Sequence, residues 1–214
     1  MTGPVVDRGV AELLSGGVVV CRHWAEQDLG PYYLERSPVR RDISEDRRGA
    51  SLVVGLALAT DDGSALLAAD VEVWHCDAAG VYSGYPPPAL SGGEGPASPE
   101  YRVDQTFLRG TQASNVEGMV EFHTIYPGWY PGRTVHIHVI VKAVGKFFVS
   151  QLYFPDQLTD EIFEVSPYSE RPGRDTTNET DVIFPTGGEP AVMTVVPVAG
   201  GYLAGARLQL PIGP

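Results

Sequence analysis

Two histidines separated by a single residue are the clearest candidates for chemistry in this sequence. His136 and His138 lie in residues 134–142, where valine and isoleucine occupy alternate positions. Side chains of a β-strand alternate between its two faces, so we expect both imidazoles on one face and the aliphatic side chains on the other. Two imidazoles at this spacing on a rigid strand could form half of a metal site. They could equally be two polar residues on the solvated face of a sheet.

Two tyrosines could complete such a site. Tyr130 lies with Arg133 in the Pro/Gly-rich turn just before the histidines, and Tyr82 follows a turn at residues 77–80. Phenolate oxygens are hard anionic ligands that suit ferric iron, and two of them would keep the metal trivalent. A tyrosine at such a position could instead cover the core with its ring and leave its hydroxyl in water.

A third histidine offers another completion. His75 and His123 both lie in predicted strands, and either could join the pair in a three-histidine zinc or copper site. A cupin-type site is disfavoured because no glutamate follows the pair at the expected distance. The residue types alone therefore leave the metal and its full ligand set open.

The elements that must position these residues are mainly strands. Alternating or β-branched stretches predict strands at residues 52–60, 71–76, 134–142, 147–154, 193–199 and 202–210. A hairpin turn near Gly145 should pair the third and fourth strands and place Gln151 beside the histidines. Helical signal is limited to a surface helix or arm within residues 9–20 and one short helix around residues 160–164. We predict an all-β fold, a β-sandwich of mainly antiparallel strands with long loops and few short helices.

Irregular stretches separate these strands. Residues 22–51 are rich in turn signals and should wrap over the core, so we divide the chain into an N-terminal arm and wrap, residues 1–50, and a β-sandwich core, residues 51–214, within one domain overall. Residues 84–104 are rich in proline and glycine and directly follow the Tyr82 segment. They could form a lid or wall over a site, or a mobile surface excursion.

Charge and cysteine content exclude several classes of protein. The chain has 15 Lys+Arg against 27 Asp+Glu, a net charge of -12 at pH 7, which argues against nucleic acid and against an anionic membrane as partner. Only Cys21 and Cys76 are present, so a disulfide framework is excluded and we expect two buried thiols. The apolar residues 9–20 lack the basic start and the small cleavage residue of a signal peptide, which predicts a cytoplasmic protein.

Four stretches of the sequence resemble one enzyme family. They read LGPYYLERSPVRRDI, VEVWHCDAAGVYSGY, FLRGTQASNVEGMVEFHTIYPGWYPGRTVHIH and SQLYF. In order and spacing they are similar to the intradiol ring-cleavage dioxygenases, which include the catechol 1,2-dioxygenases and the protocatechuate 3,4-dioxygenases. The resemblance covers about residues 21–154. The chain is most similar to the short, single-domain members of this family.

The resemblance implies a β-sandwich that holds one non-haem ferric ion, Fe3+, at its edge. The implied ligands are Tyr82, Tyr130, His136 and His138. Tyr130 would also be catalytic, because in the family this tyrosine leaves the metal and takes up a substrate proton. Arg133 would stabilise negative charge on the bound substrate, and Gln151 would assist it. Pro31 and Tyr32 would line the substrate pocket.

The implied reaction is cleavage of a catechol-type ring between its two hydroxyl-bearing carbons with O2, giving a cis,cis-muconate-type product. The protein would be an oxidoreductase that incorporates both atoms of O2, with a small-molecule catechol and O2 as partners, residues 51–214 as catalytic core, and a homo-oligomer as a candidate assembly. Two alternatives come from other classes: a zinc-dependent hydrolase that uses the histidine pair, and a non-catalytic β-sandwich binding module.

Overall fold

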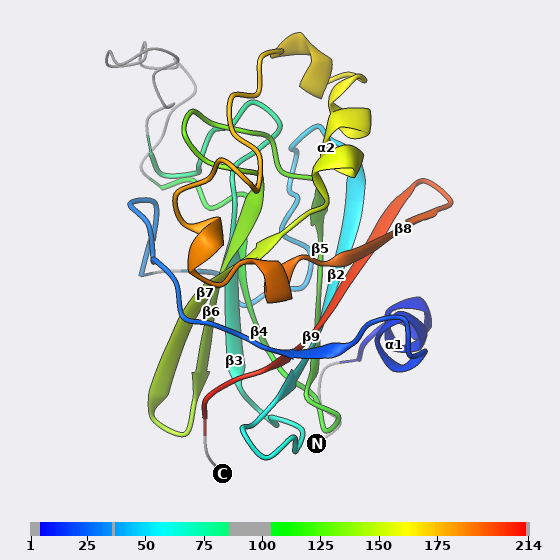
Figure 1. Cartoon of the computed structure of the whole chain (residues 1–214), viewed down its shortest axis with the longest axis vertical. Coiled ribbons are helices and arrows are strands. Elements are labelled where there is room, and N and C mark those ends of the chain that lie inside the picture. Colours follow the sequence, from blue (N-terminus) through cyan, green and yellow to red (C-terminus); the bar gives the residue numbers. More distant parts are fainter. Residues whose placement is uncertain (1–4, 36, 86–103, 213–214) are drawn as a thin grey trace.

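Two sheets pack face to face in the computed structural model, which describes residues 5–35, 37–85 and 104–212 (Figure 1). The first sheet has the order β1 (Cys21–His23), β9 (Gly201–Gln209), β2 (Ser51–Ala59) and β5 (Met119–Ile125), and β8 (Thr194–Val198) also pairs with β9. The second has the order β4 (Arg109–Ala113), β3 (Asp70–Trp74), β6 (His136–Ala143) and β7 (Lys146–Tyr153). Among these strands only β1–β9 and β2–β9 pair in parallel. The predicted β-sandwich is confirmed.

The helical content is small but exceeds the prediction. The helices are α1 (Arg8–Ser15) and α2 (Asp156–Phe163), with 3-10 turns η1 (Tyr168–Glu170), η2 (Phe184–Thr186) and η3 (Glu189–Ala191). The short helix expected around residues 160–164 begins earlier, directly after Pro155, because a proline with a φ of -61° suits the start of a helix. The 3-10 turns were not predicted, since three residues are too few to show a helical period.

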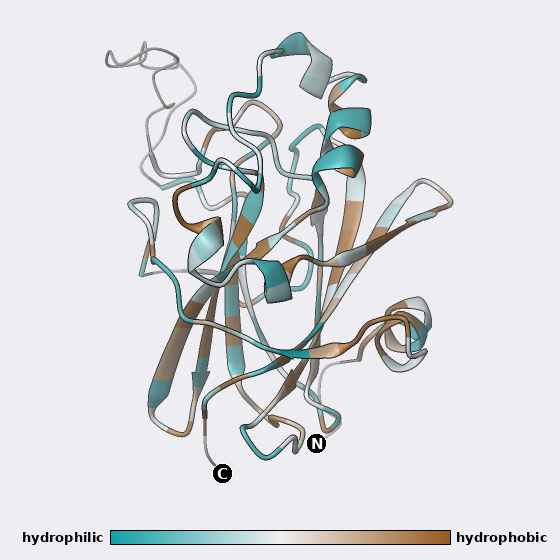
Figure 2. Cartoon of the chain, in the orientation of Figure 1, coloured by the Kyte–Doolittle hydropathy of each residue, from teal (hydrophilic) through white to brown (hydrophobic). Residues whose placement is uncertain are grey.

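The alternation in β6 decides which residues enter the core. Ile137, Val139 and Val141 lie between the sheets and join Val71 and Val73 of β3 in one buried cluster. Hydrophobic colouring follows the strands, whereas α2 is largely hydrophilic (Figure 2). A slip of one residue would exchange the two faces of β6, so the aliphatic residues determine on which side the histidines lie.

The opposite face of the second sheet gathers polar and aromatic residues in one row. Trp74 of β3 lies opposite Arg109 of β4 on one side and opposite His138 of β6 on the other. Gln151 of β7 lies opposite His138, as the hairpin prediction required. Directly opposed residues of neighbouring strands share a face, so strand pairing alone brings this row together.

The N-terminal residues cover the first sheet. Val10 and Leu14 of α1 are buried, and Gly55 of β2 permits their close approach because a Cβ at that position would collide with the Val10 side chain. The predicted surface helix is confirmed. The chain then touches both sheets, since the backbone N–H of Ile43 donates to His123 in β5 and the N–H of Thr111 in β4 donates to Pro38. The division at residue 50 stays a prediction.

The cysteines do not behave alike. Cys76 is buried, and its thiol donates to the Gly128 carbonyl at 3.3 Å. Cys21 is exposed, so the expectation of two buried thiols is wrong for it, because β1 lies at the edge of the sheet with all its residues in solvent. Both thiols are free.

Two further expectations concern a lid and the membrane. Most of the stretch predicted to form a lid or wall, residues 86–103, lies outside the described residues. No helix in the described part of the chain is long and apolar enough to cross a bilayer.

Candidate metal centre

The two histidines point their ring nitrogens at each other. His136 Nε2 and His138 Nε2 are 3.0 Å apart, and both side chains are buried. His136 Nδ1 donates to the Thr134 carbonyl at 2.6 Å, which leaves a lone pair on its Nε2. Burial and the nearby Arg133 lower the pKa of His136 to about 3, and burial likewise lowers the pKa of His138. Both imidazoles are therefore neutral and able to ligate a metal at neutral pH.

The two tyrosines reach the same place from different turns. Tyr130 Oη lies 3.3 Å from His136 Nε2, and the Tyr82 ring lies 5.7 Å from the Tyr130 ring. The Tyr82 ring is also 6.1 Å from the His138 ring. Burial raises the pKa of both phenols above the ordinary tyrosine value. Without a bound cation they stay protonated.

Two atoms of the candidate ligands, the Tyr82 hydroxyl and His138 Nδ1, have no well-formed hydrogen bond within the described residues. Tyr82 is only 1% exposed, and its hydroxyl interacts with the Tyr130 phenol, itself a candidate ligand. An unsatisfied buried hydroxyl costs about 1–3 kcal/mol, so a missing ligand is the simplest explanation. Two imidazole nitrogens and two phenol oxygens form the donor set that hard, trivalent iron accepts. The residues present thus fit a non-haem ferric ion.

Packing between two turns explains why the tyrosines converge. The Asp77 carboxylate accepts the backbone N–H groups of Ala79 and Val81 and shapes the turn that leads to Tyr82. The turn that carries Tyr130 starts at Gly128, whose N–H donates to the Asp77 carbonyl at 3.1 Å. A Cβ at Gly128 would lie 2.5 Å from that carbonyl oxygen, so only glycine allows the turns to meet.

Arg133 is held beside the histidines by an acid that the sequence did not indicate. Its Nη2 donates to Gln151 Oε1 at 2.5 Å, and its Nε lies 2.8 Å from Asp181 Oδ2. Gln151 is fixed in turn by the Tyr153 hydroxyl, which donates to the same Oε1 at 3.1 Å. Asp181 comes from a stretch with many acidic residues, and no pattern in it distinguished this one.

An aromatic wall encloses the phenols. The Tyr32 ring stacks on Tyr82 with 4.3 Å between centroids, and Tyr32 meets Tyr130 edge to face at 5.8 Å. Trp74 stacks on His138 at 4.8 Å, a contact that the predicted strand pattern did not reveal. The structure brings Tyr32 to the site, whereas Pro31 is exposed beside it.

Neither candidate third histidine joins the pair. His75 is satisfied by the Cys76 carbonyl at 2.8 Å and the Thr124 hydroxyl at 2.7 Å. His123 lies in the other sheet, 2.6 Å from Glu121. A three-histidine site is therefore not formed, because β3 and β5 direct these imidazoles elsewhere.

Another grouping of potential ligands has a different explanation. Asp7, Glu121 and His123 place one ligand atom each within 4.8 Å of one another. Arg41 already occupies this grouping, since its guanidinium pairs with both Glu121 and Asp7. Its positive charge accounts for the acids without a metal, and the tyrosine and histidine centre is the better iron candidate.

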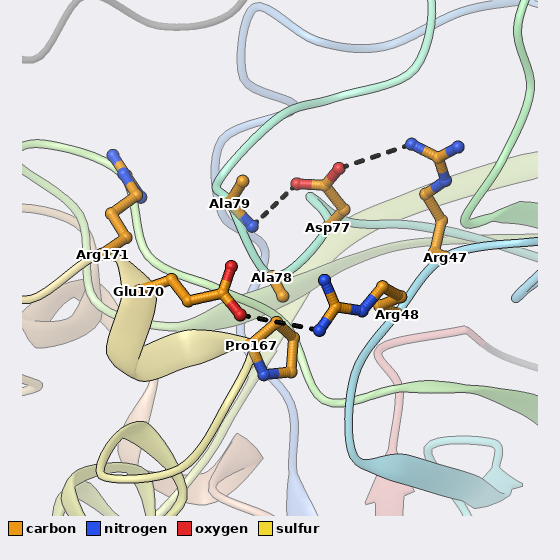
Figure 3. A pocket seen from close by; sticks show the side chains of 8 residues that line it. All are labelled: Arg47, Arg48, Asp77, Ala78, Ala79, Pro167, Glu170 and Arg171. Carbon is orange, nitrogen blue, oxygen red and sulfur yellow. Dashed lines mark hydrogen bonds and ion pairs between the residues drawn. The ribbon is translucent and has the colours of Figure 1, made fainter.

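A cavity of about 660 Å³ lies apart from these ligands (Figure 3). It is lined by arginines and acids, with Arg47 3.8 Å from Asp77 and Arg48 3.5 Å from Glu170. None of the four candidate ligands lines it. Its paired charges offer no donor set for a metal.

Solved structures similar to this chain include dioxygenases. No family model matches the chain. An intradiol ring-cleavage dioxygenase from Tetranychus urticae is similar in structure, with 32% identity, a TM-score of 0.78, and coverage of 90% of this chain and 97% of that one. The dioxygenase domain of a dioxygenase and carbohydrate-binding protein fusion from Streptomyces sp. SirexAA-E has 25% identity and a TM-score of 0.65, covering 90% and 100%.

A curated relative matches over a shorter span. Chlorocatechol 1,2-dioxygenase from Rhodococcus opacus is 26% identical over 159 residues, which is 62% of this chain. The match spans 57% of that relative's length.

Proposed function

The chain belongs to the intradiol ring-cleavage dioxygenases, and from this membership we propose that it uses one ferric ion to cleave a catechol-type ring between its hydroxyl-bearing carbons. The observation that carries the proposal is the meeting of His136, His138 and Tyr130 around the buried Tyr82 hydroxyl. Both atoms of O2 would enter the product, a cis,cis-muconate-type dicarboxylate.

We assign the four converging side chains as the protein ligands of iron: Tyr82, Tyr130, His136 and His138. A ferric ion held by these four side chains would supply Lewis-acid chemistry to a catechol substrate. His136 is oriented for this role by the Thr134 carbonyl, and His138 by the stacked Trp74 ring. The fixed imidazoles hold the site on β6 while other groups exchange.

Tyr130 has a second role in substrate binding. It is the more exposed phenol, at 8% against 1% for Tyr82, and its raised pKa makes its oxygen a strong base once ionised. The Tyr130 oxygen would therefore serve as the base that accepts one hydroxyl proton of a bound catechol. The remaining substrate proton requires a second base.

Arg133 places a fixed positive charge at the same edge of the site. Asp181 and Gln151 hold its guanidinium at 2.8 and 2.5 Å, so it need not reorganise when negative charge develops on the ring. Asp181 compensates the charge of Arg133 through Nε, which leaves other N–H groups of the guanidinium able to donate. We propose that Arg133 stabilises the electron-rich ring that reacts with O2, with Gln151 as its support.

The substrate is expected to be a flat, apolar ring. Tyr32 stands against both phenols, and the partly buried Leu29, Tyr33 and Val149 pack around the same cluster. Such a wall excludes water and favours an aromatic ring over a flexible polar substrate. Pro31 at the rim is proposed as a weaker contact.

The zinc hydrolase and the binding module are less well supported. A zinc site would need a third nitrogen or carboxylate ligand, and the described residues supply two phenols at that place instead. A binding module would not need to bury two neutral imidazoles and a hydroxyl without a well-formed hydrogen bond.

Oxygen consumption with a panel of catechols tests the proposal. The iron-loaded protein should be red to burgundy from tyrosinate-to-iron charge transfer and should consume one O2 for each ring-opened dicarboxylate. Product NMR would identify the cleaved bond. A semialdehyde product would indicate cleavage outside the hydroxyl pair and contradict the proposal, as would a colourless protein that does not take up ferric iron.

A further inference from the structure

Arg109 is a buried cation with no acidic partner among the described residues. Its side chain is 1% exposed, its Nη1 has no hydrogen-bond partner, and no carboxylate in the described part of the chain forms an ion pair with it. A buried charge of this kind is costly, by several kcal/mol, unless an opposite charge compensates it. Arg133 shows the ordinary solution, because Asp181 lies 2.8 Å from its Nε.

Strand register directs Arg109 toward the proposed iron site. Arg109 lies opposite Trp74, and Trp74 lies opposite His138, so all three share the outer face of the second sheet. The next residue in β4, Gly110, faces the other way, toward Ile43. Arg109 and Arg133 therefore flank the centre, one at the β4 edge of the sheet and one beside β7.

The guanidinium of Arg109 forms two hydrogen bonds with Ser83, the residue that follows Tyr82. Its Nε donates to Ser83 Oγ at 2.8 Å and its Nη2 donates to the Ser83 carbonyl at 2.9 Å. The Ser83 hydroxyl passes a hydrogen bond on to the Phe107 carbonyl at 2.7 Å. This double contact fixes the backbone next to Tyr82 and keeps the positive charge beside the Tyr82 turn.

The charge itself survives burial. Burial lowers the pKa of Arg109 to about 10, so the side chain is still a cation at neutral pH, and an ionised Tyr82 is the strongest opposing influence. The two anomalies are complementary. Among the described residues, the buried Arg109 has no carboxylate partner, and the buried hydroxyl of Tyr82, the residue next to Ser83, has no well-formed hydrogen bond.

We propose that Arg109 is a positioning residue for Tyr82: its guanidinium fixes the Ser83 backbone, and its charge balances the Tyr82 oxygen when that oxygen is a negatively charged metal ligand. This inference rests on the proposed iron site. A positive charge near a metal-bound phenolate stabilises the phenolate electrons. Removing the charge should move the charge-transfer band to longer wavelength and lower the ferric/ferrous midpoint potential.

The test compares neutral and charged replacements. Arg109→Met and Arg109→Gln should both shift the band to longer wavelength and lower the potential, whereas Arg109→Lys should stay near the wild-type values. Ser83→Ala, which removes one acceptor and leaves the charge, should also stay near wild type. Spectra and potentials are measured on iron-loaded protein whose folding has been checked by circular dichroism, so the readout does not depend on turnover.

Two backgrounds identify the tyrosine involved. With Tyr130→Phe only the Tyr82 phenolate remains, and the shift caused by Arg109→Gln should persist. With Tyr82→Phe the shift should disappear in whatever iron-loaded protein is obtained. Arg174→Met is the matched control, because it removes a guanidinium with a 9% exposed side chain that pairs with Asp156 away from the site; its band should not move.

The outcomes separate this inference from the function on which it rests. A wild-type protein that takes up no ferric iron would remove the iron site itself. A coloured wild type in which the Gln and Lys variants have the same band and potential would overturn the role of Arg109 alone. If Arg109→Met does not fold, the comparison of Arg109→Gln with Arg109→Lys still tests the role of the charge. The Gln side chain can donate to Ser83 without a charge, whereas the Lys side chain carries the charge without the paired guanidinium donors.

Discussion

The two tyrosine-bearing turns present the same side chain in different settings. Tyr82 is 1% exposed, stacks on Tyr32 at 4.3 Å, and is followed by Ser83, which Arg109 holds at two atoms. Tyr130 is 8% exposed and is followed by Pro131 and then by Gly132, which has a φ of +79° and open space where a Cβ would be. The residue after Tyr82 is thus held by a buried guanidinium, whereas the Tyr130 turn is held by backbone contacts and by the Gly132 N–H, which donates to the exposed Asp175 carboxylate.

That difference explains how one centre could contain a permanent and an exchangeable oxygen ligand. Both phenols have the same intrinsic chemistry, and burial raises the pKa of each. What differs is the exposure of the two rings and the residue beside each: a buried arginine holds the residue after Tyr82, whereas the Tyr130 carbonyl accepts the Arg133 N–H at 3.4 Å and its hydroxyl lies 3.3 Å from His136 Nε2. Ligand exchange is therefore expected at Tyr130.

The largest expected effect tests whether the two turns serve one metal at all. His136→Ala removes the imidazole nearest to the Tyr130 hydroxyl, so iron content and colour should be lost and turnover should fall by more than about 100-fold. His123→Ala is the control, and it should retain iron measured by elemental analysis. The reverse pattern would move iron to the grouping of Asp7, Glu121 and His123.

Substitution of each phenol breaks the comparison directly. Tyr82→Phe should lose most of its iron, because the fixed ligand is gone. Tyr130→Phe should keep iron but turn over about 100-fold more slowly, because it lacks the base that takes up the substrate proton. Elemental analysis and steady-state oxygen uptake give the two readouts. Equal iron loss in both variants would remove the distinction between a fixed and an exchangeable tyrosine.

Asp181 sharpens the comparison on the Tyr130 side. Asp181→Asn keeps the shape of the side chain but removes the charge opposite Arg133, so Arg133 should be less well oriented and kcat should fall about 10-fold with iron content unchanged. Asp160→Asn, which alters an exposed pair with Arg174, is the control and should leave kcat unaltered. An unchanged kcat in Asp181→Asn would show that Arg133 needs no carboxylate.

Gly30 lies against the His138 ring at the proposed metal centre. It has a φ of +72°, and a Cβ there would lie 2.9 Å from His138 Cε1. Gly30→Ala should cost about 1–2 kcal/mol from the backbone alone and should also displace His138, which would lower activity several-fold. Gly63→Ala pays the same backbone cost at a φ of +84° with no atom within 4 Å, so urea unfolding should shift without loss of specific activity. Equal specific activities of the Gly30→Ala and Gly63→Ala variants would mean that the backbone at Gly30 shifts to accommodate the added methyl group without displacing His138.

The smallest effect concerns acid stability. Burial would raise the pKa of Asp181, but N–H donors from Thr134 and Phe184 and the Arg133 ion pair outweigh burial and lower it. Because the pKa of Asp181 is lower in the folded state than its unfolded value of about 3.9, the ionised carboxylate stabilises the fold above that pH. This stabilisation is lost as the pH falls through the folded-state pKa. The stability advantage of the iron-free wild type over Asp181→Asn should therefore be present at pH 6 and shrink below pH 4. A constant difference in urea midpoints would contradict this.

Local periodicity was enough to predict much of the fold. The alternation in residues 134–142 placed His136 and His138 on one face, and the hairpin at Gly145 placed Gln151 opposite His138. These predictions succeeded because strand faces and hairpin register depend on a few neighbouring residues. Cys21 was misjudged because exposure of β1 depends on its being an edge strand, which no local pattern records.

The sequence by itself determined the side-chain chemistry: which imidazoles share a strand face, which phenols were available, and which family the motifs resemble. Only the tertiary structure decided that the Asp77 and Gly128 turns meet, that Asp181 pairs with Arg133, and that the buried Arg109 contacts Ser83. These relations join residues from about 26 to 51 positions apart, where the sequence carries no periodic signal. Packing between turns therefore sets how deeply each tyrosine is buried and which residues support it.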